Sequence, residues 1–454
     1  MVTIVMKFGG SSMGSSDSIR QCAKIVFRAK AKNRLFVVVS ALGGVTDELI
    51  RLIDLARSQK PKLIASRLNA IERRHKEVLG GLVSSAHAAR VWEEECAPLF
   101  KKLRYILTGI SFVGEVAEKS YALICSFGER ISSILMFHAL VAAGVRAEHV
   151  LAQRLIRTDS NYKDATVDYK KTRGYVKRIA APLLAKGIVP VIGGFIGKDT
   201  SGDITLLGRG GSDYTASIVA ASLDADSVEI WTDVDGIMSA DPRLIEKPAL
   251  WKEIDIQVMA EMAYSGAKVL HPKTIVPAIQ KHIPIYIKNT FRPETKGTKV
   301  VESVTPGLRG IVVDANQVLL HLTNASMLEG VGFIHGVSEI CARHGVPIDV
   351  CATSEVSFTI SIRKEDYTPK LYKDLSKIAG LEVYEAVAKV CVIGRGIARN
   401  ANILAKIAAA LKEYQLYAVS CGASFNNITL IVERARANDI LRLLHNTLFP
   451  NPKS

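Results

Sequence analysis

Residues 5–16 read VMKFGGSSMGSS, a short apolar run that ends in Lys7 and continues through two glycines and a group of serines. Glycine loops that join a strand to a helix expose backbone N–H groups, and the helix N-terminus favours negative charge. In a P-loop, however, the lysine follows the glycines and lies on the first helical turn. Here Lys7 precedes them at the end of a predicted strand, so we expect its ammonium to extend over the loop. This order predicts a phosphoryl-transfer site of a different architecture.

Two further glycine loops follow predicted strands: SALGGVTD at 40–47 and TLLGRGGSDYTA at 205–216. In a parallel sheet the loops after strands gather at one edge, where ligands bind beside helix N-termini. Any one loop has an ordinary alternative, a turn that needs glycine for its geometry. Together, with Lys7 and Arg209 at their edges, the three loops predict one shared site for anions.

Composition and charge restrict the class of protein. With 454 residues, 48% of them hydrophobic, the chain is long enough for two or three globular domains. A net charge of +15 would suit nucleic-acid binding, but the basic clusters lie on helix-like stretches with interspersed acids. We therefore predict solvated helix faces that steer small anions, and no nucleic-acid partner.

Location and metal content are predicted from the apolar runs and the cysteines. The longest apolar runs, such as LFVVVSAL, have strand length, and the N-terminus enters a strand-like segment without a signal-peptide layout. This predicts a cytoplasmic protein with no membrane partner. Seven scattered cysteines and ten histidines show no ligand spacing, which predicts free buried thiols and no structural metal.

The order of predicted elements indicates the fold. Strands, glycine loops and helices alternate to about residue 295, which predicts an α/β fold with an open, mostly parallel sheet flanked by helices. Residues 62–125 contain few turn signals and read as a helical insert or lid. Pro, Gly and Thr accumulate at 291–310, where we expect a domain boundary. Beyond it the order β-α-β-β-α occurs twice, which fits two ferredoxin-like units.

One segment of the second unit imitates a dinucleotide-binding fingerprint. VCVIGRGIARN offers a strand, Gly394, Gly396 and a helix, but Arg399 stands at the third glycine position. A strand-to-helix turn is the better interpretation of this segment.

Five motifs occur in the order typical of aspartate kinases, and the chain resembles the amino-acid kinase family over essentially its whole length. These motifs are KFGGSS, SFGER, LGRGGSDYTA, WTDVDGIMSADPR and SGAKVLHPKT. The resemblance implies a carbamate-kinase-like catalytic domain at 1–300, with the helical insert at 62–125. It also implies two intertwined βαββαβ ACT domains at 308–454. The reaction implied is the ATP-dependent phosphorylation of L-aspartate to 4-phospho-L-aspartate, with Mg²⁺ on the phosphates and feedback by lysine.

The chemistry of this reaction agrees with the residue types present. The acceptor carboxylate has a reference pKa of about 3.9 and is already ionised at pH 7, so no general base is required. The difficulty is the approach of two anions, which calls for fixed positive charge and oriented N–H groups. The resemblance assigns catalytic roles to Lys7, Asp213 and Lys268.

The resemblance also implies binding residues. The substrate-binding positions are Ser40, Thr46, Glu129, Arg209, Gly210, Gly211 and Ser212. The nucleotide-binding positions are Lys7, Phe8, Gly9, Gly10, Ser11, Thr232, Asp233, Met238, Arg243, Lys268 and Val269. For Glu129, a first-turn acid of the following helix is the ordinary alternative. Met238 replaces a tyrosine common in the family, and Ser11 replaces a threonine.

A third implied set concerns an effector in the first ACT domain. Its positions are Met327, Gly330, Val331, Asp349, Ser354 and Glu355, and the acids suit a cationic effector such as lysine. Gly330 replaces a polar side chain often found there. Pairing of ACT sheets implies a homodimer or a tetramer. Three alternatives stay open: a kinase of another small carboxylate such as glutamate, a non-catalytic amino-acid sensor, and an RNA-binding protein.

Overall fold

The computed structural model describes residues 1–267, 270, 272–324 and 332–449. These residues form two compact units. The N-terminal unit comprises residues 1–237 and 270–301, and the C-terminal unit comprises 238–269 and 302–454. The domain limits of 1–300 and 308–454 stay a prediction.

The N-terminal unit contains a largely parallel sheet. Its strand order is β3 (Ala147–His149), β4 (Val189–Gly193), β2 (Asn33–Val39), β1 (Val2–Phe8), β7 (Ser227–Thr232), β9 (Ile285–Asn289) and β10 (Thr298–Val301). Neighbouring strands are parallel except β9 and β10, which are antiparallel. The centre of β2, Leu35–Val39, is buried on both faces, as expected for a strand inside a parallel sheet. This confirms the predicted fold class.

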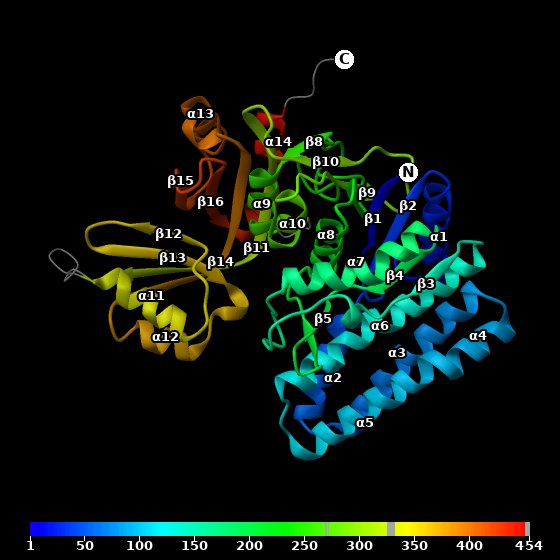
Figure 1. The fold of residues 1–454 in the computed structure, drawn as a ribbon. Coiled ribbons are helices and arrows are strands. Elements are labelled where there is room, and N and C mark those ends of the chain that lie inside the picture. Colours follow the sequence, from blue (N-terminus) through cyan, green and yellow to red (C-terminus); the bar gives the residue numbers. More distant parts are fainter. Residues whose placement is uncertain (268–269, 271, 325–331, 450–454) are drawn as a thin grey trace. The chain divides into compact units, whose positions relative to one another are not determined.

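Helices cover both faces of this sheet (Figure 1). Helices α1 (Ser16–Lys30) and α6 (Glu118–Ala142) contact one another and β2, and α7 (Tyr169–Ala185), α8 (Gly211–Leu223) and α10 (Pro272–Ile279) form a second contacting group. Helix α1 begins at a capping box between Ser15 and Ser18, which satisfies backbone N–H groups that the helix itself cannot pair. Its buried residues recur every three or four positions, from Ile19 to Val26.

The region between β2 and β3 is helical, as the scarcity of turn signals predicted. It holds α2 (Val45–Arg57), α3 (Pro61–Leu82), α4 (Ser85–Val91), the π-helix η1 (Trp92–Cys96) and α5 (Ala97–Val113), followed by α6. In Figure 1 the helices α3, α5 and α6 lie alongside one another. Their apolar faces belong to the main hydrophobic core together with β1 and β2. The insert is thus packed on the sheet domain as part of its core.

Helix α6 is long and apolar enough to cross a membrane by length and composition alone. However, 83% of its most apolar window is buried inside the structure, which is the property of a core helix. The remaining short elements of this unit are η2 (Ala152–Arg154) and the antiparallel pair β5 (Ile196–Lys198) and β6 (Ile204–Leu206).

The C-terminal unit contains one antiparallel sheet. Its order is β12 (Val350–Thr353), β13 (Ser357–Arg363), β11 (Gly307–Thr323), β14 (Gly380–Arg395), β16 (Asn427–Glu433) and β15 (Leu416–Cys421). The helices are α9 (Ile256–Tyr264), α11 (Phe333–Arg343), α12 (Pro369–Leu375), α13 (Ala401–Ala410) and α14 (Ala437–Leu448). The strand β8 (Glu253–Asp255) and the short 3-10 turns η4 (Lys364–Asp366), η5 (Ile397–Arg399) and η6 (Arg434–Arg436) complete it.

Two long strands carry both ferredoxin-like halves. Residues 317–323 of β11 pair with residues 380–387 of β14, whereas residues 307–314 pair with 389–395. Each half therefore has the strand order of a βαββαβ unit. In the half with β12 and β13, β11 is a middle strand and β14 is an edge strand, and in the half with β15 and β16 these two strands exchange places. One half packs on α11 and α12 and the other on α13 and α14. The register shifts between Asp314 and Gln317, where the two halves meet.

All seven cysteines are free, as predicted. Five are buried, but Cys351 and Cys421 are exposed, so the prediction of burial was wrong for these two. They lie on β12 and β15, the two edge strands of the C-terminal sheet, where fewer neighbours cover a side chain.

Candidate active site

A cavity of about 680 Å³ lies in the N-terminal unit, and it is lined by the loops that join β1 to α1, β2 to α2 and β6 to α8. The parallel neighbours β1 and β2 bring their two loops to one sheet edge, as predicted. The third glycine loop also lines the cavity, but it follows β6 of the separate antiparallel pair β5 and β6, so the prediction that it follows a strand of the parallel sheet was wrong. Predicted site residues that line this cavity are Lys7, Gly10, Ser40, Thr46, Glu129, Arg209, Gly210, Gly211, Ser212 and Asp213. The structure thus brings together every predicted substrate-binding position.

Lys7 and Asp213 form an ion pair inside this cavity. The Lys7 Nζ lies 2.6 Å from Asp213 Oδ1, and the two side chains are 10% and 14% exposed. Lys7 is the penultimate residue of β1, and Asp213 is in the first turn of α8. Since both groups are largely removed from water, the pair restricts the ammonium to one position. The lysine is therefore pre-positioned at the mouth of the first glycine loop.

Glu129 is a buried carboxyl group on α6 that also lines the cavity. The residue is 4% exposed, and its Oε2 has no hydrogen-bond partner among the described residues. Burial raises the pKa of Glu129 to about 7, while the backbone N–H of Ala41 and the charge of Lys7 act in the opposite direction. Gly193 on β4 allows this close packing, because a Cβ there would lie 2.7 Å from the Glu129 carbonyl oxygen. A cationic group in the cavity would satisfy the unpaired oxygen.

Two helix N-termini open into the same cavity. Helix α2 begins after Gly44 and α8 after Gly210, and neither helix has a side-chain cap. Both glycines have positive φ angles, 82° and 68°, a conformation that strains residues with a Cβ. The first N–H group of each helix donates to a loop carbonyl, Val45 to Leu42 and Gly211 to Gly208. No side chain caps the next N–H groups of the first turn, so these are available to an anion.

Arg209 supplies a further positive charge at the cavity wall. It is exposed, and within the described residues it forms no ion pair. The flanking glycines Gly208 and Gly210 both have positive φ angles, which turn the chain sharply at this position. A guanidinium in this place can bind a carboxylate with two parallel hydrogen bonds.

The first glycine loop also contacts the end of β7. The Gly9 N–H donates to the Trp231 carbonyl at 3.0 Å, and the Ser12 hydroxyl donates to the same oxygen at 3.2 Å. Phe8 is fully buried and stacks on Trp231 with ring centroids 6.1 Å apart. Of the predicted nucleotide-binding residues, Phe8 therefore offers only its backbone, whereas Ser11 is exposed.

Residues after β7 complete this edge of the sheet. The Thr232 hydroxyl donates to Asp233 Oδ1 at 3.0 Å. Asp235 is held by Asn289 Nδ2 at 2.7 Å and by Arg292 Nη2 at 2.6 Å. Asp235 thus organises the turn after β7.

The chain matches known proteins over most of its length. Residues 2–289 match the amino acid kinase family. Lysine-sensitive aspartokinase 3 of Escherichia coli (strain K12) is 31% identical over 456 residues, which cover 98% of this chain and 99% of that protein. The chain belongs to the amino acid kinase family and, within it, to the aspartokinases.

Other aspartokinases agree with this membership. Chloroplastic aspartokinase 1 of Arabidopsis thaliana is 29% identical over 99% of this chain and 80% of that protein. The crystal structure of E. coli aspartokinase III in complex with aspartate and ADP, in the R-state, has a TM-score of 0.84 at 31% identity, covering 98% of this chain and 100% of that one. A complex of the same enzyme with lysine and aspartate, in the T-state, has a TM-score of 0.83 with 98% and 99% coverage.

Four predicted residues remain, of which the structure describes two. Met238 and Arg243 belong to the C-terminal unit, where Met238 forms a bridge with Leu250 and Arg243 pairs with Asp241. Lys268 and Val269 lie outside the described residues.

The predicted effector positions of this aspartokinase fall partly outside the described chain. Met327, Gly330 and Val331 are not among the described residues. Ser354 and Glu355 are exposed in the turn between β12 and β13, where the Ser354 hydroxyl lies 2.7 Å from the Ser357 hydroxyl.

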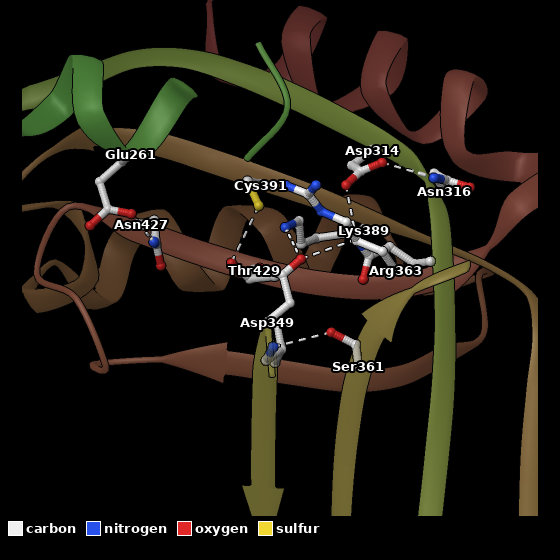
Figure 2. Close-up of polar contacts among 12 residues, drawn as sticks. Glu261, Asp314, Asn316, Asp349, Ser361, Arg363, Lys389, Cys391, Asn427 and Thr429 are labelled. Carbon is white, nitrogen blue, oxygen red and sulfur yellow. Dashed lines mark hydrogen bonds and ion pairs between the residues drawn. The ribbon is translucent and has the colours of Figure 1, made fainter. Parts of the chain in front are cut away.

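Asp349, the remaining effector position, is engaged by protein groups (Figure 2). Its carboxylate forms an ion pair with the Lys389 ammonium and accepts a hydrogen bond of 3.0 Å from Gln317 Nε2. The Lys389 side chain is only 3% exposed. The sequence signal for this pair was Lys389, a lysine within the otherwise apolar stretch AVAKVCVIG of β14. This signal does not indicate which acidic residue the lysine contacts.

Sequence reasoning also missed cavity residues. Phe195, Tyr121 and Lys163 line the cavity, and Lys163 pairs with Glu118 at 3.2 Å. Phe195 has a φ of 68°, which is unusual for a residue with a Cβ, and its N–H donates to the Thr215 hydroxyl at 2.9 Å. The only signal was its place after the two glycines of VIGGFIG.

Proposed function

We propose that this chain transfers the γ-phosphoryl group of ATP to the side-chain carboxylate of L-aspartate, giving 4-phospho-L-aspartate and ADP. This reaction is the entry step to lysine, threonine and methionine. The aspartokinase relatives support the assignment, in particular the E. coli structure with aspartate and ADP. One observation carries the assignment here. A single cavity contains both the buried carboxyl group of Glu129, with one oxygen that lacks a partner among the described residues, and several groups that can bind anions.

The cavity is complementary to the charges of aspartate. The substrate carries one ammonium and two carboxylates at neutral pH. Glu129 is the acceptor for the ammonium, because its free oxygen is buried and would otherwise lack a partner. Arg209 and the N-terminus of α8 bind the α-carboxylate.

The side-chain carboxylate then faces the positively charged groups that carry the phosphoryl transfer. An oxygen of this carboxylate forms a bond to the γ-phosphorus, and the bond from that phosphorus to the bridging oxygen of ADP breaks, so the electron pair leaves with ADP. No proton is removed, since the carboxylate is ionised at pH 7. Lys7 neutralises the charge that accumulates as the two anions meet, and Asp213 keeps its ammonium in place.

Mg²⁺ enters with ATP in this proposal. Among the residues that the structure describes, no three His, Cys, Asp or Glu side chains are grouped to hold a metal ion. An ion bound with ATP would be held mainly by phosphate oxygens, and it would supply charge neutralisation between the phosphates. The backbone N–H groups of the first glycine loop and of the loop after β7 bind the nucleotide alongside it.

Three further features belong to the proposal. The enzyme acts in the cytoplasm, is inhibited by lysine through its ACT-like halves, and assembles as a homodimer or tetramer. The lysine complex of the E. coli relative supports the second feature. The exposed edge strands β12 and β15 are available for sheet pairing between subunits.

Trapping of the acyl phosphate as a hydroxamate tests the proposal directly. Aspartate should give hydroxamate at a rate at least tenfold above glutamate, which is the rival substrate, and added lysine should lower that rate. Lys7→Met should reduce the rate at least 100-fold, because it removes the charge nearest the transfer. Lys24→Met, at an exposed position of α1, is the matched control and should retain the rate. Equal rates with glutamate, or full activity of Lys7→Met, would refute the assignment.

A further inference from the structure

Arg74 lies on α3, in the helical insert, and reaches both glycine loops of the cavity. Its Nη1 donates to the Gly43 carbonyl at 2.8 Å, and its Nη2 donates to the Gly14 carbonyl at 3.1 Å. The two acceptors are 31 and 60 residues away in sequence. Among the described residues Arg74 forms no ion pair, so the two loop carbonyls are the groups that its guanidinium contacts.

The two loops that Arg74 joins already touch through their backbones. A Cβ on Gly43 would lie 3.1 Å from the Gly10 carbonyl oxygen, and one on Gly10 would lie 3.4 Å from the Gly43 Cα. Both glycines line the cavity. A van der Waals contact between two backbones is weak, and it offers no directional bond. The bidentate guanidinium supplies that direction, because each of its N–H groups meets one loop.

The hydrogen bond to Gly43 also orients the next peptide N–H. In a trans peptide the C=O of Gly43 and the N–H of Gly44 point in opposite directions. Since the carbonyl faces Arg74, the Gly44 N–H faces away from it. Gly44 lines the cavity and starts α2 without a side-chain cap. Arg74 therefore fixes the direction of the Gly44 N–H, which has no partner among the residues described and lies at the positive end of a helix.

The Gly14 side of the contact is equally constrained. The peptide that follows Gly14 donates its N–H, from Ser15, to the Ser18 hydroxyl at 2.9 Å. A second arginine strengthens the attachment, because Arg20 Nη1 on α1 donates to the Gly81 carbonyl of α3 at 2.7 Å. The helix α3 is thus fastened to the start of α1 at two points.

We propose that Arg74 is a positioning residue of the phosphoryl-transfer site. It holds the loop after β1 and the loop after β2 in one register, so that their N–H groups converge on the phosphate and carboxylate oxygens while Lys7 lies between them. This role rests on the proposed aspartate kinase activity. It makes the helical insert a part of the catalytic apparatus even though no residue of α3 lines the cavity.

Steady-state kinetics on three variants test this role. Arg74→Gln should lower kcat/KM for both aspartate and ATP at least 20-fold. The kcat/KM of Arg74→Lys should lie between that of the wild type and that of Arg74→Gln, because an ammonium reaches one carbonyl at a time. Arg73→Gln is the matched control: Arg73 is the neighbouring residue, its side chain is 76% exposed, and its nearest acid is Glu77 at 4.0 Å. It should stay within twofold of the wild type.

A second measurement separates positioning from general stability. Ethylguanidine should restore part of the activity of Arg74→Ala at millimolar concentration and leave Arg73→Ala unchanged. Hydrogen exchange should increase at residues 9–15 and 40–46 of Arg74→Gln, without an increase at β1 and β2 themselves.

The outcomes are distinguishable. Arg74→Gln with wild-type kinetics and wild-type exchange in both loops would overturn the inference. Global rather than local exchange in both Arg74→Gln and Arg74→Lys would also overturn it, because the residue would then act on folding alone. Absence of aspartate phosphorylation in the wild type would instead refute the proposed function, and the exchange result would still decide whether Arg74 joins the loops.

Discussion

Replacing Glu129 by glutamine should make the unliganded enzyme more stable and less active. Glu129 has an ionisable oxygen with no partner among the described residues, in a position that is 4% exposed. Ionisation of this group in the folded state is therefore unfavourable, and it is tolerated because the cavity awaits a cation. Glutamine keeps the shape and removes the charge.

The size and sign of the effect follow from the pKa. Burial raises the pKa of Glu129 from 4.5 to about 7. At about 1.4 kcal/mol for each pH unit, ionised Glu129 lowers the free energy of unfolding by about 3 kcal/mol above pH 7. This penalty is absent below pH 4.5, where the group is protonated in both states. It grows as the pH rises from 4.5 to 7, because only the unfolded state then loses its proton.

Calorimetric unfolding of wild type and Glu129→Gln at pH 5 and pH 8 measures this difference. Burying the polar amide of glutamine offsets part of the stability gained by removing the charge. We therefore expect a net increase in the free energy of unfolding of about 2 kcal/mol at pH 8 and of less than about 1 kcal/mol at pH 5. For a unit of this size the pH 8 value corresponds to about 5 °C in Tm. The KM for aspartate should rise roughly 100-fold, the loss expected for one buried charge pair.

Glu94→Gln is the control, because Glu94 is exposed on η1. Its substitution should change neither the free energy of unfolding nor the KM for aspartate. A Glu129→Gln enzyme that is less stable than the wild type at pH 8, or that binds aspartate normally, would contradict the reasoning.

Two further predictions concern regulation and packing. Because the Lys389 ammonium already neutralises Asp349, Lys389→Met should change the lysine concentration that halves activity at least fivefold, measured by hydroxamate formation, while the uninhibited rate stays within twofold. Gly193→Ala should lower stability by about 1–3 kcal/mol and raise the KM for aspartate, because its Cβ would lie 3.0 Å from the Glu129 Cβ and displace that residue.

Each of these predictions has a matched control. Lys373→Met, at an exposed position of α12, should leave lysine inhibition unchanged. Gly80→Ala on α3 has no atom within 4 Å of its Cβ and should stabilise the helix by up to about 1 kcal/mol. Unaltered inhibition in Lys389→Met, or a neutral effect of Gly193→Ala, would count against the corresponding contact.

The sequence by itself determined the local chemistry of this protein. The apolar run before Lys7, the glycines after it, and the later Arg209 and Asp213 were enough to predict that three glycine loops share one site, although the third follows β6 of the separate pair β5 and β6 and not a strand of the parallel sheet. Turn residues, helix caps and apolar periodicity act over a few residues, so they can be read without knowing what lies opposite. The same is true of the two repeated βαββα orders of the C-terminal unit.

The tertiary structure alone decided which groups meet and which are buried. The pairing of Lys389 with Asp349 and the contact of Arg74 with two loops join positions that are dozens of residues apart. The burial of Glu129, with one oxygen left without a partner among the described residues, likewise depends on distant segments. Desolvation depends on every neighbour of a group, and a hydrogen bond depends on distances below about 3.5 Å, so neither property is encoded in a short stretch of sequence. The double role of the long strands β11 and β14 could not be predicted from sequence for the same reason, because only their pairing along the full sheet shows that each serves both halves.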